Sequence, residues 1–239
     1  MANIMIIGAS RGLGRAFVEG LPDATDKVIG ISRGQPSGIK VQSGAELQWI
    51  EADMSNPMQA AQAISDRAPH DIDTLIYNVG IWEEEAFEDS YQFEQDTDAQ
   101  IIEMVSVNIT STILLLKRLL PRLLSASKPQ IILTGSTSAL RQAGRPEVTF
   151  AASKHALNGI ADSLREGYRK NNLAVTCLQL GYLNTDDALD VPLSEAVKNG
   201  EGHFIPVHDV VAVVRTLLSL SPCSFVRELT MPAIRDERF

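Results

Sequence analysis

The strongest constraint on the fold is an alternation of short apolar runs with longer amphipathic segments along the 239 residues. Seven runs have the length and composition of buried strands, and five intervening segments space their apolar residues at helical intervals. Repetition of strand and helix in this order is typical of a parallel sheet with helices on both faces. We expect strands at residues 3–8, 27–32, 47–52, 72–78, 129–135, 173–180 and 225–231, and helices at 12–21, 57–68, 97–124, 149–171 and 208–220.

The alternation runs through the chain without a repeat, a low-complexity linker or a change of composition. We therefore expect one domain over residues 1–239, a doubly wound α/β fold with a parallel sheet of about seven strands. Residues 83–98 carry eight carboxylates and are expected to form a solvated loop and a helix start. Residues 184–206 follow a strand end and lack clear periodicity. Loops at the carboxyl ends of such strands border the ligand crevice, so this segment is expected to form a lid over a substrate.

Charge and composition exclude several classes of function. Thirty acidic and 21 basic residues give a net charge of -9, which argues against a general affinity for nucleic acid or for anionic membrane surfaces. The longest apolar run, TILLLKRLL, is interrupted by Lys117 and Arg118, so we expect no membrane span. The N-terminus lacks the features of a signal peptide, and a soluble cytoplasmic protein is expected. Cys177 and Cys223 are expected to be buried apolar residues, and no residues have the spacing of a metal site.

A glycine turn joins the first expected strand to the first expected helix. In IIGASRGLGRAF (6–17), the spacing of Gly8, Gly12 and Gly14 is G-x-x-x-G-x-G. Glycine permits a tight turn and lets backbone amides approach a phosphate closely. The helix N-terminus behind the turn adds a partial positive charge. At this place in an alternating chain, the pattern predicts a dinucleotide site.

The end of the second strand indicates which dinucleotide is bound. An acid there would hold a ribose 2′-hydroxyl, whereas a base would accommodate a 2′-phosphate. This strand ends with Ser32 and Arg33, and Arg11 in the glycine turn can reach the same phosphate. The two arginines favour NADP(H) over NAD(H). Asp53, after the third strand, can contact the adenine edge or cap the helix that begins near Pro57, and the sequence does not separate these interpretations.

Six short segments follow one another over nearly the whole chain: GASRGLG (8–14), YNVG (77–80), VNITST (107–112), LTGSTSA (133–139), FAASK (150–154) and LGYLNT (180–185). Together they resemble the motifs of the short-chain dehydrogenase/reductase family. The chain departs from the usual pattern at Ile7, where threonine is usual, and at Leu180, where proline is usual. The resemblance implies a Rossmann fold, a nicotinamide cofactor, a small-molecule substrate, and a homodimer or homotetramer formed through residues 97–124 and 149–171.

The resemblance also implies roles for individual residues. Asn108, Ser136 and Lys154 fall on the catalytic asparagine, serine and lysine of the family, and Phe150 falls on the catalytic tyrosine. In the family, that tyrosine protonates the developing oxyanion, and the neighbouring lysine lowers its pKa. The cofactor-binding positions implied are Gly8, Ser10, Arg11, Gly12, Leu13, Gly14, Ser32, Arg33, Asp53, Met54, Asn78, Gly80, Lys154, Leu183 and Thr185.

Phe150 has no proton to give, and a general acid typically contributes about 10²–10⁴-fold in rate. The substitution is compatible with an engineered inactive form or with a natural enzyme whose conjugated enone or imine substrate needs no acid there. It is also compatible with a catalytically silent NADP-binding protein that has a regulatory or structural role. Tyr182, near the expected nicotinamide site, can supply a proton or can simply pack there. The activity expected first is NADP(H)-dependent hydride transfer involving a small carbonyl, alcohol or conjugated substrate.

Overall fold

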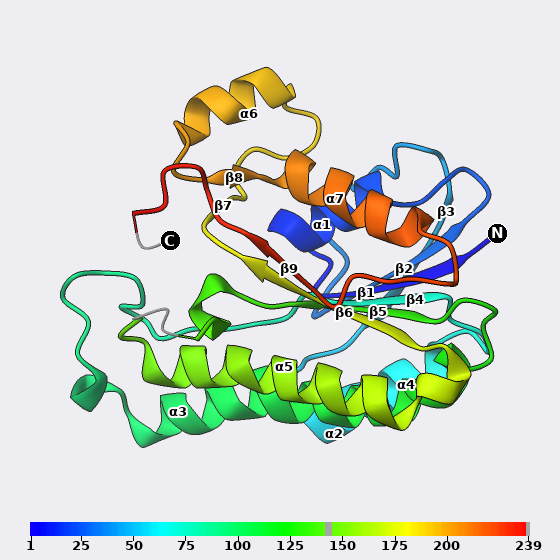
Figure 1. The fold of residues 1–239 in the computed structure, drawn as a ribbon, viewed down its shortest axis with the longest axis horizontal. Helices are drawn as coiled ribbons and strands as arrows, with labels where there is room; N and C mark the ends of the chain where they lie inside the picture. The colour runs from blue at the N-terminus through cyan, green and yellow to red at the C-terminus, as the bar shows by residue number, and fades with distance from the viewer. Residues whose placement is uncertain (142–144, 238–239) are drawn as a thin grey trace.

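The computed structural model describes residues 1–141 and 145–237, which form a parallel sheet between two layers of helices (Figure 1). The seven strands lie in the order β3-β2-β1-β4-β5-β6-β9, and every neighbouring pair is parallel. The order reverses direction at β1, so the expected doubly wound α/β fold is confirmed. The strands are β1 Asn3–Ile7, β2 Lys27–Ser32, β3 Glu46–Glu51, β4 Thr74–Tyr77, β5 Gln130–Thr134, β6 Ala174–Leu180 and β9 Glu228–Met231.

Helices cover both faces of this sheet, as the alternation of the sequence predicts. Helices α1 and α7 pack together above the sheet in the view of Figure 1, and α2, α3, α4 and α5 lie below it. Two short strands, β7 and β8, and the helix α6 between them extend from the upper layer. The bounds are α1 Gly12–Gly20, α2 Pro57–Arg67, α3 Asp98–Val105, α4 Ser111–Leu123, α5 Val148–Gly167, β7 Leu183–Asn184, α6 Leu193–Gly200, β8 Ile205–Pro206 and α7 Val207–Ser219.

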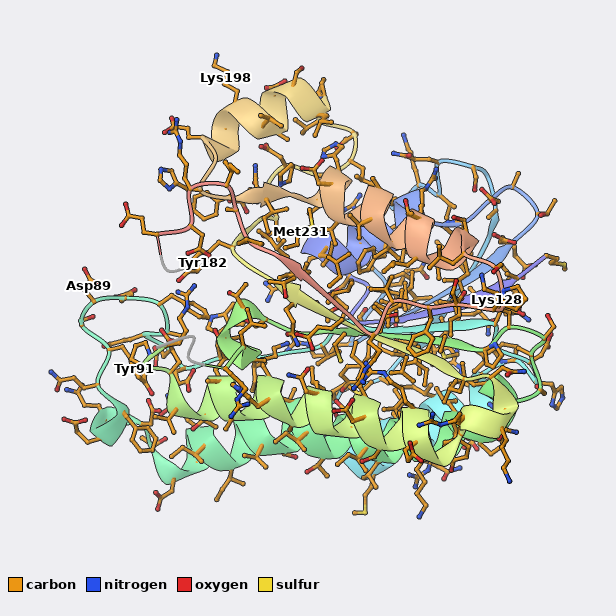
Figure 2. All side chains as sticks on the ribbon, in the orientation of Figure 1. Asp89, Tyr91, Lys128, Tyr182, Lys198 and Met231 are labelled. Atoms are coloured by element: carbon orange, nitrogen blue, oxygen red, sulfur yellow. The ribbon has the colours of Figure 1, made fainter. Side chains whose placement is uncertain are left out.

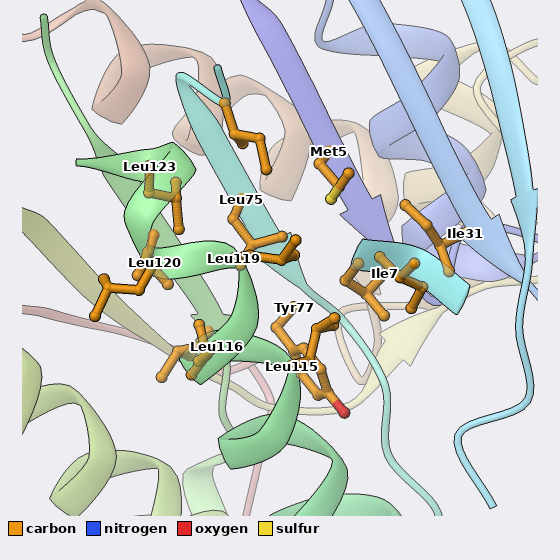
Figure 3. Close-up of a cluster of buried hydrophobic side chains, with 14 of the residues drawn as sticks. Met5, Ile7, Ile31, Leu75, Tyr77, Leu115, Leu116, Leu119, Leu120 and Leu123 are labelled. Carbon is orange, nitrogen blue, oxygen red and sulfur yellow. The ribbon is translucent and has the colours of Figure 1, made fainter. Parts of the chain in front are cut away.

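The core is divided by the sheet into two apolar clusters. Because side chains alternate along a strand, Met5 and Ile7 of β1 enter one cluster, and Ile4 and Ile6 enter the other. Figure 3 shows the first cluster, where leucines of α4 pack on β1, β2 and β4. These strands are buried on both faces, which explains their nearly continuous apolar sequence.

Helices α3 and α4 are joined by a π-helical turn, Ser106–Thr110, into one continuous helix over Asp98–Leu123. By length and composition this helix is apolar enough to cross a membrane, a test that core helices of soluble proteins also pass. In the structure its residues Leu115 and Leu119 are fully buried against the sheet. Its apolar character therefore supplies much of the core below the sheet.

Three local expectations differ from the structure. Glu83, at the start of the acidic segment, is buried because it bonds to a helix N-terminus, while most of the other carboxylates are exposed. Cys177 is buried as expected, but Cys223 is exposed because it lies in a surface turn after α7. Residues 184–206 contain the regular elements α6 and β8 despite their weak periodicity.

Candidate functional site

A cleft of about 830 Å³ opens at the carboxyl ends of β1, β2, β4, β5 and β6. Its walls bring together the glycine turn, the ends of β2 and β3, and the start of α5, which are far apart in the sequence. Of the expected site residues, only Gly14 and Asn108 do not line it. Those that do are Gly8, Ser10, Arg11, Gly12, Leu13, Ser32, Arg33, Asp53, Met54, Asn78, Gly80, Ser136, Phe150, Lys154, Leu183 and Thr185.

The glycine turn has a backbone that other residues would strain. Gly8 and Gly12 have φ of +83° and +52°. A Cβ on Gly8 would lie 2.7 Å from the carbonyl oxygen of Asn78, and a Cβ on Gly14 would lie 1.9 Å from the carbonyl oxygen of Gly8. Gly14 therefore lets α1 start directly against the turn. The first turn of α1 carries no acidic side chain, and Arg11 makes no capping bond, so its backbone N–H groups suit an anion.

Polar side chains at the ends of β2 and β3 form the outer part of the cleft. Arg11 and Arg33 are exposed, and neither guanidinium has an ion pair or hydrogen bond among the residues described. Ser32 donates its hydroxyl to the carbonyl of Gly34 at 2.8 Å. Asp53 accepts from the backbone N–H of Ser55 at 3.0 Å, whereas the cap position of α2 is Asn56. Asp53 is therefore not the cap of that helix.

Lys154 and Phe150 lie one helical turn apart on the buried face of α5. The Lys154 Nζ atom lies 5.6 Å from the centre of the Phe150 ring and donates to the carbonyl oxygen of Thr134 at 3.0 Å. Burial lowers the pKa of Lys154 to about 8. A Cβ on Gly80 would lie 3.0 Å from this Nζ, so the glycine leaves room for the ammonium group.

Ser136 and Asn108, the two other expected catalytic residues, differ in what their side chains bind. The Ser136 hydroxyl oxygen accepts the backbone N–H of Ser138 at 3.1 Å, which leaves its own proton available to a substrate. Asn108 lies in the π-helical turn, where its side chain bonds to both the N–H and the carbonyl of Ile81, at 2.9 and 2.8 Å. It also donates to Ser153 at 2.9 Å. The Asn108 side chain therefore holds the wall segment around Ile81.

Five aromatic side chains, which we call the aromatic belt, form a connected group in or beside the inner cleft. Phe87 is central: its ring centre lies 6.2 Å from Trp82, 5.5 Å from Phe150 and 5.7 Å from Tyr182. Tyr182 also contacts Phe204 at 6.4 Å. Phe87 has a left-handed backbone, with φ of 75°. Apart from Phe150 and Tyr182, the belt has no motif in the sequence that would have identified it.

Arg145, which the sequence analysis also missed, reaches the belt from the segment before α5. Its Nη1 donates to the Tyr182 hydroxyl oxygen at 2.9 Å, and its guanidinium carbon lies 5.2 Å from the centre of that ring. Its Nη2 lies 3.7 Å from Oδ2 of Asp236. The side chains of Arg145 and Asp236 are only 5% and 3% exposed. A buried cation thus adjoins a phenol inside the cleft.

Two buried carboxylates, the crossed glutamate pair Glu83 and Glu147, tie the belt to α5. Glu83 accepts the backbone N–H of Phe150, and Glu147 accepts the backbone N–H of Phe87, each at 2.9 Å. The second carboxylate oxygen of each residue is buried and makes no hydrogen bond to the residues described. The exchange joins the residue 83–87 loop to the start of α5 at two points.

Known proteins share both sequence and fold with this chain. A protein-family model described as short chain dehydrogenase matches residues 2–194. The uncharacterized oxidoreductase YciK of Escherichia coli is 30% identical over 193 residues, which cover 76% of this chain and 73% of YciK. The 3-oxoacyl-[acyl-carrier-protein] reductase MabA of Mycobacterium tuberculosis is 24% identical over 239 residues, with coverage of 96% and 90%.

Two solved structures are similar in fold. An alcohol dehydrogenase from Thermococcus sibiricus complexed with 5-hydroxy-NADP has a TM-score of 0.80 and 19% identity, and the match covers 99% of this chain and 98% of that one. A metagenomic short-chain oxidoreductase in complex with NADP has a TM-score of 0.70 and 23% identity, with coverage of 97% and 96%. At these identities the likeness establishes the fold alone.

Proposed function

The chain belongs to the short-chain dehydrogenase family, and from this premise we propose that it is an oxidoreductase that uses NADP(H) to reduce a small carbonyl or conjugated substrate. The observation that carries the proposal is one cleft that joins the glycine turn, the group of Ser136, Phe150 and Lys154, and two arginines that have no partner among the described residues. The alcohol oxidation that reverses ketone reduction would use the same groups.

The cleft residues fit a nicotinamide dinucleotide. Gly8 and Gly12 have the backbone that a close phosphate approach needs, and the N–H groups of α1 would hold the pyrophosphate. Arg11 and Arg33, which lack partners among the described residues, would hold a 2′-phosphate. The other proposed contacts are Asp53 and Met54 with adenine, Asn78, Gly80 and Lys154 with the nicotinamide ribose, and Leu183 and Thr185 with the nicotinamide. When bound, the reduced cofactor supplies the hydride.

The chain's own residues would bind and orient the substrate. Ser136 can donate its hydroxyl proton to the substrate oxygen, because its oxygen already accepts from Ser138. Lys154 places a buried cation beside the same space. We propose that Phe150 takes the place of the family's tyrosine, since it lies in the cleft one helical turn from that lysine. The aromatic belt suits a flat, apolar or conjugated substrate.

The remaining family-level features are also proposals. Residues 184–206 would act as a substrate lid, because Thr185 and Asp186 at their start line the cleft. The helices at 97–124 and 149–171 would form the homodimer or homotetramer interface; Ile102 and Ile113 on the first of them are exposed. We also propose that the chain is a soluble cytoplasmic protein, in keeping with its net charge of -9.

The test is NADPH oxidation, followed by absorbance at about 340 nm, with ketones, quinones, imines and enones as acceptors. NADPH binding is measured in parallel from nicotinamide fluorescence. Turnover of any acceptor supports the proposal, and the same assay on Phe150→Tyr shows whether a hydroxyl at that position widens the range to ordinary ketones. Binding without turnover by either chain would favour the alternative, a catalytically silent NADP-binding protein, which the missing hydroxyl at Phe150 also suggests. Failure to bind NADPH would refute both.

A further inference from the structure

We infer that Tyr182 supplies the proton that Phe150 cannot, and that Arg145 positions it and stabilises the negative charge it acquires. The inference rests on the proposed function, because it concerns the proton that must accompany hydride transfer. It assigns a catalytic role to Tyr182 and a positioning role to Arg145 and to the Asp236 carboxylate behind it.

Tyr182 lies on the wall of the cleft that faces the start of α5. It follows β6 at the carboxyl edge of the sheet and lines the same cavity as Ser136, Phe150 and Lys154. The ring of Phe87 contacts Phe150 at 5.5 Å and Tyr182 at 5.7 Å, both edge to face. Figure 2 shows Tyr182 between the upper layer of the molecule and the loop that carries Asp89 and Tyr91. A substrate beside Phe150 would therefore be near this phenol.

The hydrogen bond to Arg145 orients the Tyr182 hydroxyl group. A guanidinium can only donate, so the phenol oxygen accepts from Nη1 at 2.9 Å. The phenol's own proton is consequently free to point to a third atom. Among the described residues, the rings in contact with Tyr182 are Phe87 and Phe204, neither of which can accept this proton strongly. An oxygen of a substrate in the cleft is a suitable acceptor.

Arg145 also supplies the charge that a proton donor needs. A phenol that gives up its proton becomes negative, and a guanidinium is charged at every working pH. With its side chain only 5% exposed, Arg145 acts where water screens little, which strengthens its interaction with a phenolate. The same logic applies to the lysine beside the family's tyrosine. Here the cation adjoins a phenol at a different place in the cleft.

Asp236 holds the guanidinium in place from the other side. Its Oδ2 lies 3.7 Å from Nη2 of Arg145, and its side chain is 3% exposed. Gly181, next to the phenol in sequence, makes this approach possible: a Cβ there would lie 3.2 Å from Cα of Pro232 and 3.4 Å from Oδ2 of Asp236. The C-terminal segment thus packs directly behind Tyr182 and places a carboxylate beside Arg145.

The step balances with these groups. The substrate carbon accepts a hydride from the reduced nicotinamide, and the electron pair of the C=O π bond moves to oxygen. The Tyr182 O–H bond breaks, its electron pair stays on the phenol oxygen, and its proton joins the substrate oxygen. The phenolate, held by Arg145, then takes a proton from solvent through the open cleft, since Tyr182 is only partly buried. In an enone, the same proton goes to the oxygen of the developing enolate.

The experiment compares Tyr182→Phe with wild type and with Tyr168→Phe, the same chemical change at a residue outside the cleft. With the best acceptor found, Tyr182→Phe should lower kcat by about 10²-fold or more, while the Kd for NADPH from nicotinamide fluorescence changes by less than about twofold. Adding Phe150→Tyr to Tyr182→Phe should restore kcat, because it returns a phenol to the site. Tyr168→Phe should retain wild-type kcat.

Arg145 is tested through the same phenol. Arg145→Lys should retain more kcat than Arg145→Met, because it keeps a cation. The double variant Arg145→Met with Tyr182→Phe should lose no more than Tyr182→Phe alone, since residues that act as a unit are not additive.

Three results would overturn the inference while the proposed function stands: kcat of Tyr182→Phe equal to that of Tyr168→Phe, a parallel loss of NADPH binding, or no rescue by Phe150→Tyr. If the losses of kcat caused by Arg145→Met and Tyr182→Phe add in the double variant, Arg145 does not act through Tyr182 and its positioning role is refuted. If wild type binds NADPH and reduces no acceptor, the proposed function fails and the inference fails with it.

Discussion

The two cleft arginines provide the sharpest test of the cofactor assignment. Arg11 and Arg33 are exposed, line the cleft, and have no ion-pair or hydrogen-bond partner among the described residues. Replacing either with glutamine therefore breaks no hydrogen bond or ion pair among the described residues and should leave the melting temperature unchanged. The replacement removes one charge-assisted hydrogen bond to a 2′-phosphate, and such bonds contribute about 1.5–3 kcal/mol.

Solvent exposure places each arginine at the lower end of this range, about 1.5 kcal/mol or roughly tenfold in Kd. We expect Arg11→Gln and Arg33→Gln each to weaken NADPH binding by about tenfold and to leave NADH binding within about twofold. The double variant should lose more than either single variant and less than about a hundredfold, because the two side chains share one phosphate and their losses do not simply add.

The assay is the Kd of each cofactor from nicotinamide fluorescence at two salt concentrations. The ratio of the Kd for NADH to the Kd for NADPH should fall as ionic strength rises, because salt screens the exposed arginine charges. Arg67→Gln, at an exposed arginine outside the cleft, is the matched control. Equal losses for NADPH and NADH, or no loss in either variant, would refute the assignment of these two residues to a 2′-phosphate.

Three further predictions concern individual residues. Burial lowers the pKa of Lys154 from 10.5 to about 8, so the folded chain binds fewer protons than the unfolded chain between these two pH values. The free energy of unfolding of wild type relative to Lys154→Met should therefore rise between about pH 8 and pH 10.5 and stay flat below pH 8, as measured by urea unfolding at several pH values. Gly14→Ala should abolish cofactor binding and lower the melting temperature, because its Cβ would lie 1.9 Å from the carbonyl oxygen of Gly8, whereas Gly159→Ala, with no atom within 4 Å of its Cβ, should be neutral or stabilising. Leu119→Ala should cost about 2–5 kcal/mol in the free energy of unfolding, because Leu119 is fully buried, and a loss under 1 kcal/mol would contradict the packing described.

The main sheet and the helices that cover it were predictable because each of these elements is encoded locally, whereas the short elements β7, α6 and β8 were not predicted. The apolar runs matched all seven strands of the main sheet, and the glycine spacing located the turn between β1 and α1. Those signals depend on neighbours within a few residues, so a periodic pattern carries them. The same holds for the placement of Phe150 one helical turn before Lys154.

Contacts between irregular segments far apart in the chain carried no such signal. Arg145 and Tyr182 are 37 residues apart, and no motif links them. Glu83 looked like one more carboxylate in an acidic run, yet it is buried because it accepts a backbone N–H from α5. Asp236 lies still further along the chain, beyond the last strand. Side-chain pairing of this kind becomes visible only when the fold brings the segments together.

The crossed glutamate pair has an evolutionary consequence. Loss of Glu83 would leave the backbone N–H of Phe150 without its acceptor, and loss of Glu147 would do the same to the N–H of Phe87. Both bonds join the residue 83–87 loop to the start of α5, so each helps to keep the other in place. A lineage that replaces Glu83 therefore gains little from keeping Glu147, and the reverse is also true. Across related sequences the two positions should co-vary, with both acids present or both absent, and the conformation of residue 87 should change wherever they are lost.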